Sequence, residues 1–173
     1  MQKLWLINKQ DKPIGELNKL KAHLGKGRRH RAFTAILQNN KKEILITRRS
    51  LKKPLWPTFW DISFSSHPWV GESLEKAGQR RAKEELGISL PLSFKHLLSY
   101  EWHERWNEVF SEWEINHLLL ANYSGQIEPD PGEIREFKWL KWEKILKWAK
   151  EESEVIVPWV KIILGKIRNN DLK

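Results

Sequence analysis

The 173-residue chain contains no cysteine. This absence excludes disulfide bonds, thiolate zinc sites and a cysteine nucleophile from any mechanism. The chain also lacks an apolar run of about 18 residues, which is the length that a membrane-spanning helix needs. Its first residues lack the pattern of a signal peptide. The sequence therefore predicts a cytoplasmic protein without a membrane span.

Acidic residues are the minority among the charged ones. Lys and Arg number 31 against 22 Asp and Glu, so the formal net charge is +9 at pH 7. This charge favours an anionic partner. The cations are scattered and their longest cluster spans only residues 26–31, which favours a local anion pocket, and we expect no nucleic-acid partner. The length fits one domain over residues 1–173.

The chain is organised around residues 64–88, which read as a strand end, a turn and an acidic helix. Ser73 suits an N-cap and Gly87 suits the position after a helix, so we expect a helix over residues 73–86. Arg81 and Glu85 lie four residues apart and share a face of that helix. They form either an ion pair on a solvated surface or a site where Glu85 holds Mg²⁺ against a phosphate, because Mg²⁺ is usually shared between protein carboxylates and substrate phosphates.

Hydrophobic periodicity and turn residues predict the remaining elements. We expect strands at residues 4–7, 31–37, 43–47, 60–66, 93–100, 109–121 and 137–140, of which the second and third form a hairpin. We expect helices at residues 143–150 and 155–167, a short helical or irregular piece at 14–20, and loops at 102–108 and 126–132. Helices that flank a mixed sheet make the fold α/β or α+β.

Several metal-ligating residue types stand near the ends of these elements. Period-two alternation in the sixth expected strand places Glu112 and Glu114 on one face, and adjacent carboxylates need a cation if they are buried. His23 and His30 flank a loop with two glycines and can face one point. With His67, these imidazoles and carboxylates suit Mn²⁺, Zn²⁺ or Fe²⁺. Spacing alone does not establish that the five residues converge.

Residues 66–88 resemble the Nudix box, G-x5-E-x7-R-E-U-x-E-E-x-G-U, in which U is a bulky aliphatic residue. The residues that match are Glu72, Arg80, Glu84, Glu85, Gly87 and Ile88, and those that depart are Ser66, Arg81 and Ala82. These departures match one branch of the Nudix proteins. Residues 66–88, together with short motifs elsewhere, resemble the type 1 isopentenyl-diphosphate isomerases over nearly the whole chain. The motifs are KLKAH at 19–23, HRAF at 30–33, TRR at 47–49, WP at 56–57, SHP at 66–68 and EWE at 112–114.

The resemblance implies a Nudix-type α/β/α sandwich around a mixed sheet and the interconversion of isopentenyl and dimethylallyl diphosphate by protonation and deprotonation. It implies that Mn²⁺ or Zn²⁺ is bound by His23, His30, His67, Glu112 and Glu114. It implies that Glu85 binds Mg²⁺ with the substrate diphosphate, and that the diphosphate is contacted by Lys19, Arg49, Lys53 and Arg81. It also implies that Tyr100 and Trp159 line the prenyl pocket. The partner is then a small prenyl diphosphate, and we expect a monomer or a dimer.

The chain departs from the resembling family at one catalytic position. The family has a cysteine two residues before the His of the His-Pro pair, and this chain has Ser65 there. In the family that cysteine exchanges the allylic proton on one face, opposite the metal-bound Glu. A serine hydroxyl is far less acidic than a thiol, whose pKa is about 8.5. No base stands beside Ser65 in the sequence, so we expect impaired proton transfer, with Glu114 left as the proton donor and Tyr100 near it.

Three functions stay open from the sequence. The first is an isomerase that is slow or that uses Ser65 or water in place of cysteine. The second is a Nudix hydrolase of a nucleoside or prenyl diphosphate, which the acidic pair Glu84 and Glu85 favours and Arg81 opposes, because a metal-binding Glu is lost there. The third is a non-catalytic binder of a prenyl diphosphate or another anion, which the missing cysteine and the positive charge both permit.

Overall fold

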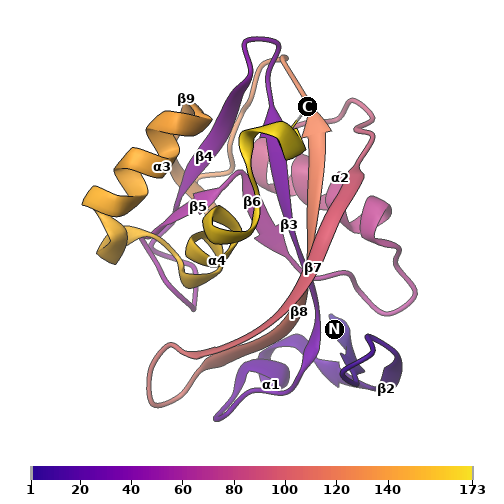
Figure 1. Ribbon diagram of the computed structural model, residues 1–173. Coiled ribbons are helices and arrows are strands. Elements are labelled where there is room, and N and C mark those ends of the chain that lie inside the picture. The colour runs from indigo at the N-terminus through magenta and orange to yellow at the C-terminus, as the bar shows by residue number, and fades with distance from the viewer. Residues whose placement is uncertain (1, 173) are drawn as a thin grey trace.

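The computed structural model describes residues 2–172, in which nine strands form one mixed sheet (Figure 1). The strands are β1 (Lys3–Ile7), β2 (Pro13–Asn18), β3 (His30–Gln38), β4 (Glu43–Arg49), β5 (Trp60–Ile62), β6 (Phe64–Ser66), β7 (Lys95–Arg105), β8 (Ser111–Asn122) and β9 (Ile134–Lys141). The helices are α1 (Lys19–His23), α2 (Leu74–Leu86), α3 (Trp142–Glu151) and α4 (Pro158–Lys166), with short 3₁₀ turns η1 (Ser153–Val155) and η2 (Asn169–Leu172).

Strand β3 is the centre of the sheet. It pairs in parallel with β8, from His30 opposite Glu114 to Gln38 opposite Asn122. It also pairs antiparallel with β6, and the start of β3 meets β1. Strands β3 and β4 pair only beside their turn, after which β4 pairs with β5 and β9. This arrangement brings the start of β3, the end of β6 and the start of β8 together.

The alternation of side chains along the inner strands builds two hydrophobic cores. In β3, Ile36 contributes to one core while Ala35 and Leu37 contribute to the other. The first core includes residues of α3 and α4, and the second includes residues of α2. Helix α2 therefore covers one face of the sheet, and α3 and α4 cover the other (Figure 1). The predicted α/β/α sandwich around a mixed sheet is confirmed.

The acidic helix is also confirmed, because α2 begins and ends at the expected caps. The Ser73 hydroxyl accepts a hydrogen bond from Lys76 N at 3.2 Å. Gly87 adopts the left-handed conformation, with φ of 70°, and its N–H bonds back to the last turn. An added Cβ at Gly87 would lie 2.8 Å from the Glu128 carbonyl oxygen. Both the backbone conformation and the packing therefore require glycine at this position.

We predict that Gly87→Ala lowers the free energy of unfolding by about 1–3 kcal/mol, since it adds a left-handed penalty and a backbone clash. Gly15→Ala is the matched control, because no atom lies within 4 Å of its added Cβ. Urea unfolding of both variants measures the difference. Equal stability of the two variants would contradict the assigned role of Gly87.

Four expected elements differ from the structure. Residues 14–20 belong mainly to strand β2, which pairs with β1, and then to the start of α1. The expected strand at 60–66 is divided at Ser63, whose φ is 42°. Strand β7 continues to Arg105, so residues 102–108 are not all loop. The last helix begins at Pro158, after the η1 turn.

Three of these differences have a physical reason in the structure. Strand β2 is stabilised by its partner rather than by its own sequence pattern. In β7, exposed charged residues alternate with the buried Trp102, and this alternation resembles a polar loop when the partner strand is unknown. Ser63 lies where β3 and β4 diverge, and its hydroxyl accepts from Leu37 N at 2.8 Å and donates to Leu45 O at 3.0 Å. Its side chain thus replaces ladder bonds between the two strands.

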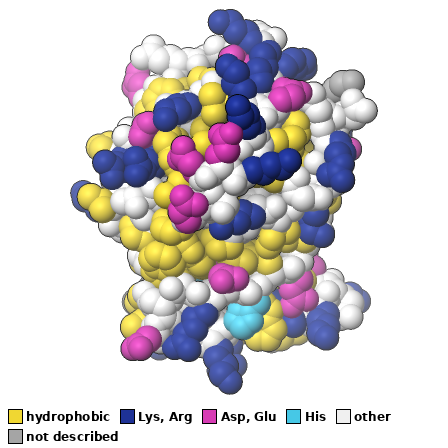
Figure 2. Space-filling model, turned by 60° about the vertical axis from the view of Figure 1, so that its left-hand side comes forward, with side chains coloured by type: hydrophobic (Ala, Val, Ile, Leu, Met, Phe, Trp, Pro, Cys, Tyr) yellow, Lys and Arg dark blue, Asp and Glu magenta, His cyan; other side chains and the backbone are white. Residues whose placement is uncertain are grey.

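Within residues 2–172, every helix is too short or too polar to cross a bilayer. Lys and Arg side chains are scattered over the face seen in Figure 2, where Asp and Glu lie among them and hydrophobic side chains form a band in the lower half. On this face the basic side chains do not gather into one patch.

Candidate active site

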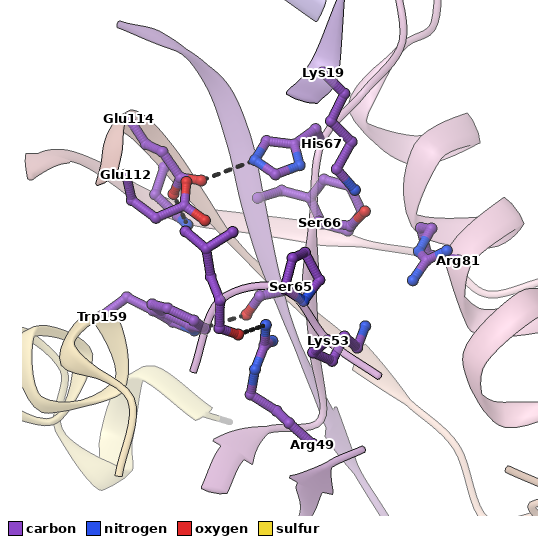
Figure 3. Close-up of a pocket in the computed structure, with 14 residues that line it drawn as sticks. Lys19, Arg49, Lys53, Ser65, Ser66, His67, Arg81, Glu112, Glu114 and Trp159 are labelled. Carbon is purple, nitrogen blue, oxygen red and sulfur yellow. Dashed lines mark hydrogen bonds and ion pairs between the residues drawn. The ribbon is translucent and has the colours of Figure 1, made fainter. Parts of the chain in front are cut away.

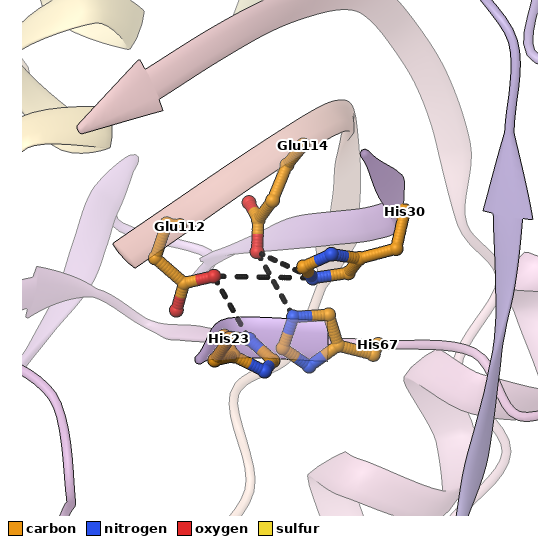
Figure 4. Close-up of side chains that lie close together, drawn as sticks. All are labelled: His23, His30, His67, Glu112 and Glu114. Carbon is orange, nitrogen blue, oxygen red and sulfur yellow. Dashed lines mark hydrogen bonds and ion pairs between the residues drawn. The ribbon is translucent and has the colours of Figure 1, made fainter. Parts of the chain in front are cut away.

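The five predicted metal ligands converge in the fold (Figure 4). His23 ends α1 and His30 begins β3, while His67 directly follows β6. The two carboxylates, Glu112 and Glu114, project from the same face of β8, as alternation predicted. One ligand atom from each of the five side chains lies within 4.8 Å of the others, and all five residues are buried. We call these residues the His/Glu cluster.

Each imidazole of the His/Glu cluster lies close to a carboxylate. His23 Nε2 lies 2.9 Å from Glu112 Oε2, and His67 Nε2 lies 2.9 Å from Glu114 Oε1. His30 Nε2 lies between the carboxylates, 3.9 Å from Glu112 Oε2 and 3.7 Å from Glu114 Oε1. Among the described residues, His30 Nε2 and Glu112 Oε2 have no aligned hydrogen-bond partner. Each unpaired buried group costs about 1–3 kcal/mol, so a cation bound between them would remove a penalty.

Backbone carbonyls fix the orientation of two imidazoles. His23 Nδ1 lies 2.6 Å from Lys19 O, and His30 Nδ1 lies 2.7 Å from Arg28 O. A carbonyl only accepts, so each Nδ1 carries the proton that it donates. The Nε2 atom of each ring is then directed into the cluster, which is the orientation found for histidines that bind metals.

Burial and mutual charge shift the pKa values of the cluster in different directions. Burial lowers the pKa of His67 well below its usual range, so its imidazole is neutral. Burial and the Glu114 charge raise the pKa of Glu112, although His23 opposes this. Burial opposes the ionisation of Glu114, but the neighbouring His30 and His67 imidazoles hold its pKa well below the usual range. The neutral His67 imidazole and the ionised Glu114 carboxylate are the forms that bind a divalent cation. Burial opposes protonation of His23, but the Glu112 carboxylate raises its pKa to about 9, so a bound cation would displace a proton from His23.

A further shell of side chains holds Glu114 in place. Trp102 Nε1 donates to Glu114 Oε2 at 3.0 Å, and Asn116 Nδ2 donates to the same oxygen at 3.3 Å. The Tyr100 hydroxyl instead donates to the Trp159 carbonyl at 3.5 Å, and burial raises the pKa of Tyr100. The sequence reasoning missed Trp102, although alternation along the strand places it on the same face as Tyr100. A catalytic role for Tyr100 stays a prediction.

A cavity opens beside the His/Glu cluster (Figure 3). Its lining includes His67, Glu112 and Glu114 from the cluster. It also includes every residue that the sequence proposed for diphosphate contact, and both Ser65 and Trp159, whereas Tyr100 is not part of the lining. Figure 3 shows the carboxylates on the left of the view and Lys19, Lys53 and Arg81 on the right. The cavity thus has an acidic side and a basic side.

Glu85 is not part of the cavity lining but lies behind two of its basic residues, Lys53 and Arg81, and only 3% of its surface is exposed. Lys53 Nζ lies 3.2 Å from Glu85 Oε2, and Arg81 contacts Glu85 Oε1 through Nε at 3.0 Å and Nη2 at 2.5 Å. Burial would raise the pKa of Glu85, but these two cations lower it below the usual value. The ion pair of Arg81 and Glu85 is therefore present, but it is not on a solvated surface as the simpler interpretation held.

Lys19 differs from the other cations on this side in its contacts. Lys53 and Arg81 both contact Glu133 as well as Glu85, and the Arg81 contact to Glu133 is 3.2 Å. The side chain of Lys19 makes no hydrogen bond or ion pair with any residue between 2 and 172. Burial lowers the pKa of Lys19, and the charges of Arg81 and Lys53 lower it further. A diphosphate bound here would relieve that repulsion between cations.

Glu84, the other member of the acidic pair, is engaged by arginines. Its Oε2 lies 3.1 Å from Arg80 Nη1 and 2.7 Å from Arg81 Nη1. Arg80 also binds Glu72 at 2.8 Å. Both carboxylates of the acidic pair are thus held by cationic side chains, Glu84 by Arg80 and Arg81, and Glu85 by Arg81 and Lys53.

Ser65 has a buried carboxylate beside it, contrary to the sequence-based expectation. Its hydroxyl donates to Asp61 Oδ1 at 3.1 Å. In a continuous strand, residues four apart would be separated by about 13 Å. The division of the strand at Ser63 brings Asp61 and Ser65 into contact instead. Only 3% of the Asp61 surface is exposed. In the sequence, a charged residue between the apolar Trp60 and Ile62 was the signal that could have indicated a function for Asp61.

Known proteins resemble this chain in sequence. The model of the NUDIX domain family matches residues 28–160. Isopentenyl-diphosphate Delta-isomerase 1 of Photorhabdus laumondii is 31% identical over 161 residues, which cover 93% of this chain and 92% of that relative. The Haloarcula marismortui isopentenyl-diphosphate Delta-isomerase is 32% identical over 170 residues, which cover 95% of this chain and 90% of the relative.

Two solved structures share the fold. A Deinococcus radiodurans protein superposes with a TM-score of 0.76 at 23% identity, covering 96% of this chain and all of the other. A MutT protein from Methanosarcina mazei superposes with a TM-score of 0.67 at 20% identity, covering 84% of this chain and 96% of the other. At these identities the two similarities show a common architecture.

Proposed function

We propose that this chain, which belongs to the Nudix family as a type 1 isopentenyl-diphosphate isomerase-like protein, converts isopentenyl diphosphate to dimethylallyl diphosphate in the cytoplasm. The observation that carries this proposal is one cavity with the His/Glu cluster on one side and four cationic residues elsewhere in its lining. The cations suit a diphosphate, and the cluster suits proton transfer to the hydrocarbon part of the same molecule. One domain over residues 1–173 performs the reaction.

The residues of the His/Glu cluster fit a divalent cation, because His30 Nε2 and Glu112 Oε2 are buried without an aligned partner among the described residues. His23, His30, His67, Glu112 and Glu114 would together hold one Mn²⁺ or Zn²⁺ ion. When bound, such an ion offsets the charge of the paired carboxylates and makes a protonated carboxyl group beside it a stronger acid.

Glu85 would hold Mg²⁺ together with the diphosphate. A single carboxylate is a poor site for this ion by itself, but it suits an ion that is shared with substrate phosphates. Lys19, Lys53 and Arg81 would bind the remaining phosphate oxygens as cations. Together these residues orient the diphosphate so that the alkene lies toward the His/Glu cluster.

In the reaction, Glu114 donates a proton to the terminal alkene carbon. Because its pKa lies well below the usual range, Glu114 must first take up that proton from water. Hydrogen bonds from Trp102 and Asn116 hold Glu114 Oε2, so that Oε1 is the atom nearer the imidazoles. Trp159 lines the cavity, and its ring stabilises the positive charge that develops on the substrate. A proton is then lost from the neighbouring carbon toward Ser65, which also lines the cavity.

The proposal predicts that protein supplied with Mg²⁺ and Mn²⁺ converts isopentenyl diphosphate to an acid-labile product. Acid lability of the radiolabelled product measures this conversion. Phosphate released from a panel of nucleoside and prenyl diphosphates, without acid-labile product, would instead establish a hydrolase. Calorimetric binding of isopentenyl diphosphate without either reaction would establish a binding protein.

A further inference from the structure

We propose that Asp61 and Ser65 form a proton-accepting pair that takes the place of the missing thiol, an inference that rests on the proposed function. Asp61 acts through Ser65 and positions its hydroxyl, while Ser65 faces the substrate. The pair accounts for how a chain without cysteine can complete the proton transfer.

The first support is the direction of the hydrogen bonds at Ser65. Trp159 Nε1 lies 2.9 Å from Ser65 Oγ and 2.9 Å from Asp61 Oδ1. An indole N–H only donates, so Ser65 Oγ accepts from it and its own hydrogen is free for Asp61, 3.1 Å away. Thr34 Oγ1 also lies 3.0 Å from Ser65 Oγ, and hydroxyl hydrogens turn to suit their partners. Thr34 is also a hydrogen-bond partner of Tyr100, and when its hydroxyl donates there, the second lone pair of Ser65 Oγ is available to the cavity.

The second support is the surroundings of Asp61. Besides Ser65 and Trp159, its Oδ1 accepts from Ile62 N at 2.8 Å, and Arg49 Nη1 lies 3.4 Å from Oδ2. Burial raises the pKa of Asp61, and the charge of Glu85 adds to this, whereas Arg49 and the hydrogen bonds oppose it. An ionised carboxylate that is poorly hydrated is a stronger base than one in water.

The third support is the place of the pair in the cavity. Ser65 lines the cavity together with Glu112 and Glu114, and Asp61 lies behind it, out of the lining. Arg49 contacts Asp61 and also lines the cavity, so it lies between Asp61 and the proposed diphosphate site. A substrate alkene between the His/Glu cluster and Ser65 would meet a proton donor and a proton acceptor.

The proton transfer balances as follows. Glu114 gives a proton to the terminal carbon of isopentenyl diphosphate, and the positive charge develops on the tertiary carbon. The C–H bond at C2 breaks, its electron pair forms the new double bond, and its proton passes to Ser65 Oγ. The hydroxyl proton of Ser65 passes at the same time to Asp61. The chain then holds one proton fewer at Glu114 and one more at Asp61, and exchange with water restores both.

A double-mutant cycle tests the pair. We expect Asp61→Asn to lower kcat by about 10²-fold or more with little change in KM, because the amide cannot accept the proton. In Ser65→Cys, a thiol with a pKa of about 8.5 forms a thiolate without help, so Asp61→Asn should lower kcat there by less than about tenfold. The two substitutions are thus expected to be strongly non-additive.

Two further variants distinguish a loss of proton transfer from a loss of folding. Ser65→Ala removes the hydroxyl with little change in volume, and we expect it to lose as much kcat as Asp61→Asn. Asp171→Asn makes the same chemical change at an exposed carboxylate of η2, and we expect it to keep the wild-type kcat. Thermal unfolding of every variant compares their stability.

The outcomes separate the inference from the proposed function. Equal losses on Asp61→Asn in the wild-type protein and in the Ser65→Cys variant would assign Asp61 a structural role and overturn the inference. Wild-type kcat in Ser65→Ala would also overturn it while the proposed function stands. No product from the wild-type protein would overturn both, whether or not Ser65→Cys is active.

Discussion

Glu114→Gln should lower kcat for isomerisation by about 10²–10⁴-fold, which is the usual contribution of a general acid. Glutamine has nearly the shape of glutamate, and its oxygen can still accept from Trp102 Nε1, so we expect the fold to be kept. The amide has no acidic proton to give to the alkene. Conversion of radiolabelled isopentenyl diphosphate to acid-labile product measures the loss.

A matched control for Glu114→Gln exists on the neighbouring strand. Glu104 of β7 lies opposite Glu112 of β8 in the sheet register, but its side chain is exposed. Glu104→Gln removes one negative charge near the site without touching the His/Glu cluster, and should keep the wild-type rate. Because Glu114 is also a proposed metal ligand, both proteins are compared at saturating Mn²⁺ and their metal content is determined. A Glu114→Gln protein that keeps more than about a tenth of the activity would remove Glu114 as the acid.

Removal of divalent metal should abolish turnover and lower the melting temperature. The His/Glu cluster holds two carboxylates and three imidazoles away from water, and its unpaired atoms favour a bound cation. A ligand at one hundred times its Kd stabilises a protein by about 2.7 kcal/mol. For a chain of this size, each kcal/mol changes Tm by about 2–4 °C, so Mn²⁺ or Zn²⁺ should raise Tm by about 5–10 °C.

A variant that lacks one proposed metal ligand tests whether the metal-dependent rise in Tm comes from the His/Glu cluster. His23→Ala should remove most of the metal-dependent rise in Tm, because His23 Nε2 and Glu112 Oε2 lie 2.9 Å apart at the proposed site. His96→Ala is the control, since His96 is exposed and lies outside the cluster. Metal analysis of the purified protein gives the stoichiometry. Less than one ion per chain under saturating conditions, together with an unchanged Tm, would contradict the metal site.

The basic side of the cavity favours isomerisation over hydrolysis. Arg81 contacts Glu84, Glu85 and Glu133, so it engages three carboxylates at once. Positive charge at this position suits a substrate whose diphosphate group is bound but not cleaved. Hydrolysis of a diphosphate instead needs carboxylates that assemble metal ions and activate water. In the sequence, only Arg81 in place of the Nudix-box Glu indicated this difference from a hydrolase. The structure shows which carboxylates Arg81 contacts.

Local signals determined part of this molecule from the sequence. The caps at Ser73 and Gly87 defined α2 because capping depends on residues close together in the chain. Alternation placed Glu112 and Glu114 on one face of β8 because the side-chain period of a strand is fixed. Family motifs named the candidate ligands His23, His30 and His67. These conclusions depended on short segments. The structure has α2 and β8 where they were expected, and it brings the candidate ligands together.

Tertiary structure decided what depends on distant or irregular contacts. Strand β2 exists because β1 pairs with it. Four of the five candidate ligands meet because β3, β6 and β8 are neighbours, and the end of α1 adds His23. Trp102, rather than Tyr100, donates to Glu114 because alternation continues through a stretch that resembles a loop. Asp61 reaches Ser65 because the strand is divided at Ser63, and the indole of Trp159, 98 residues from Asp61, joins them. The sequence by itself therefore established the family and the candidate ligands, whereas only the fold placed a buried carboxylate beside the serine.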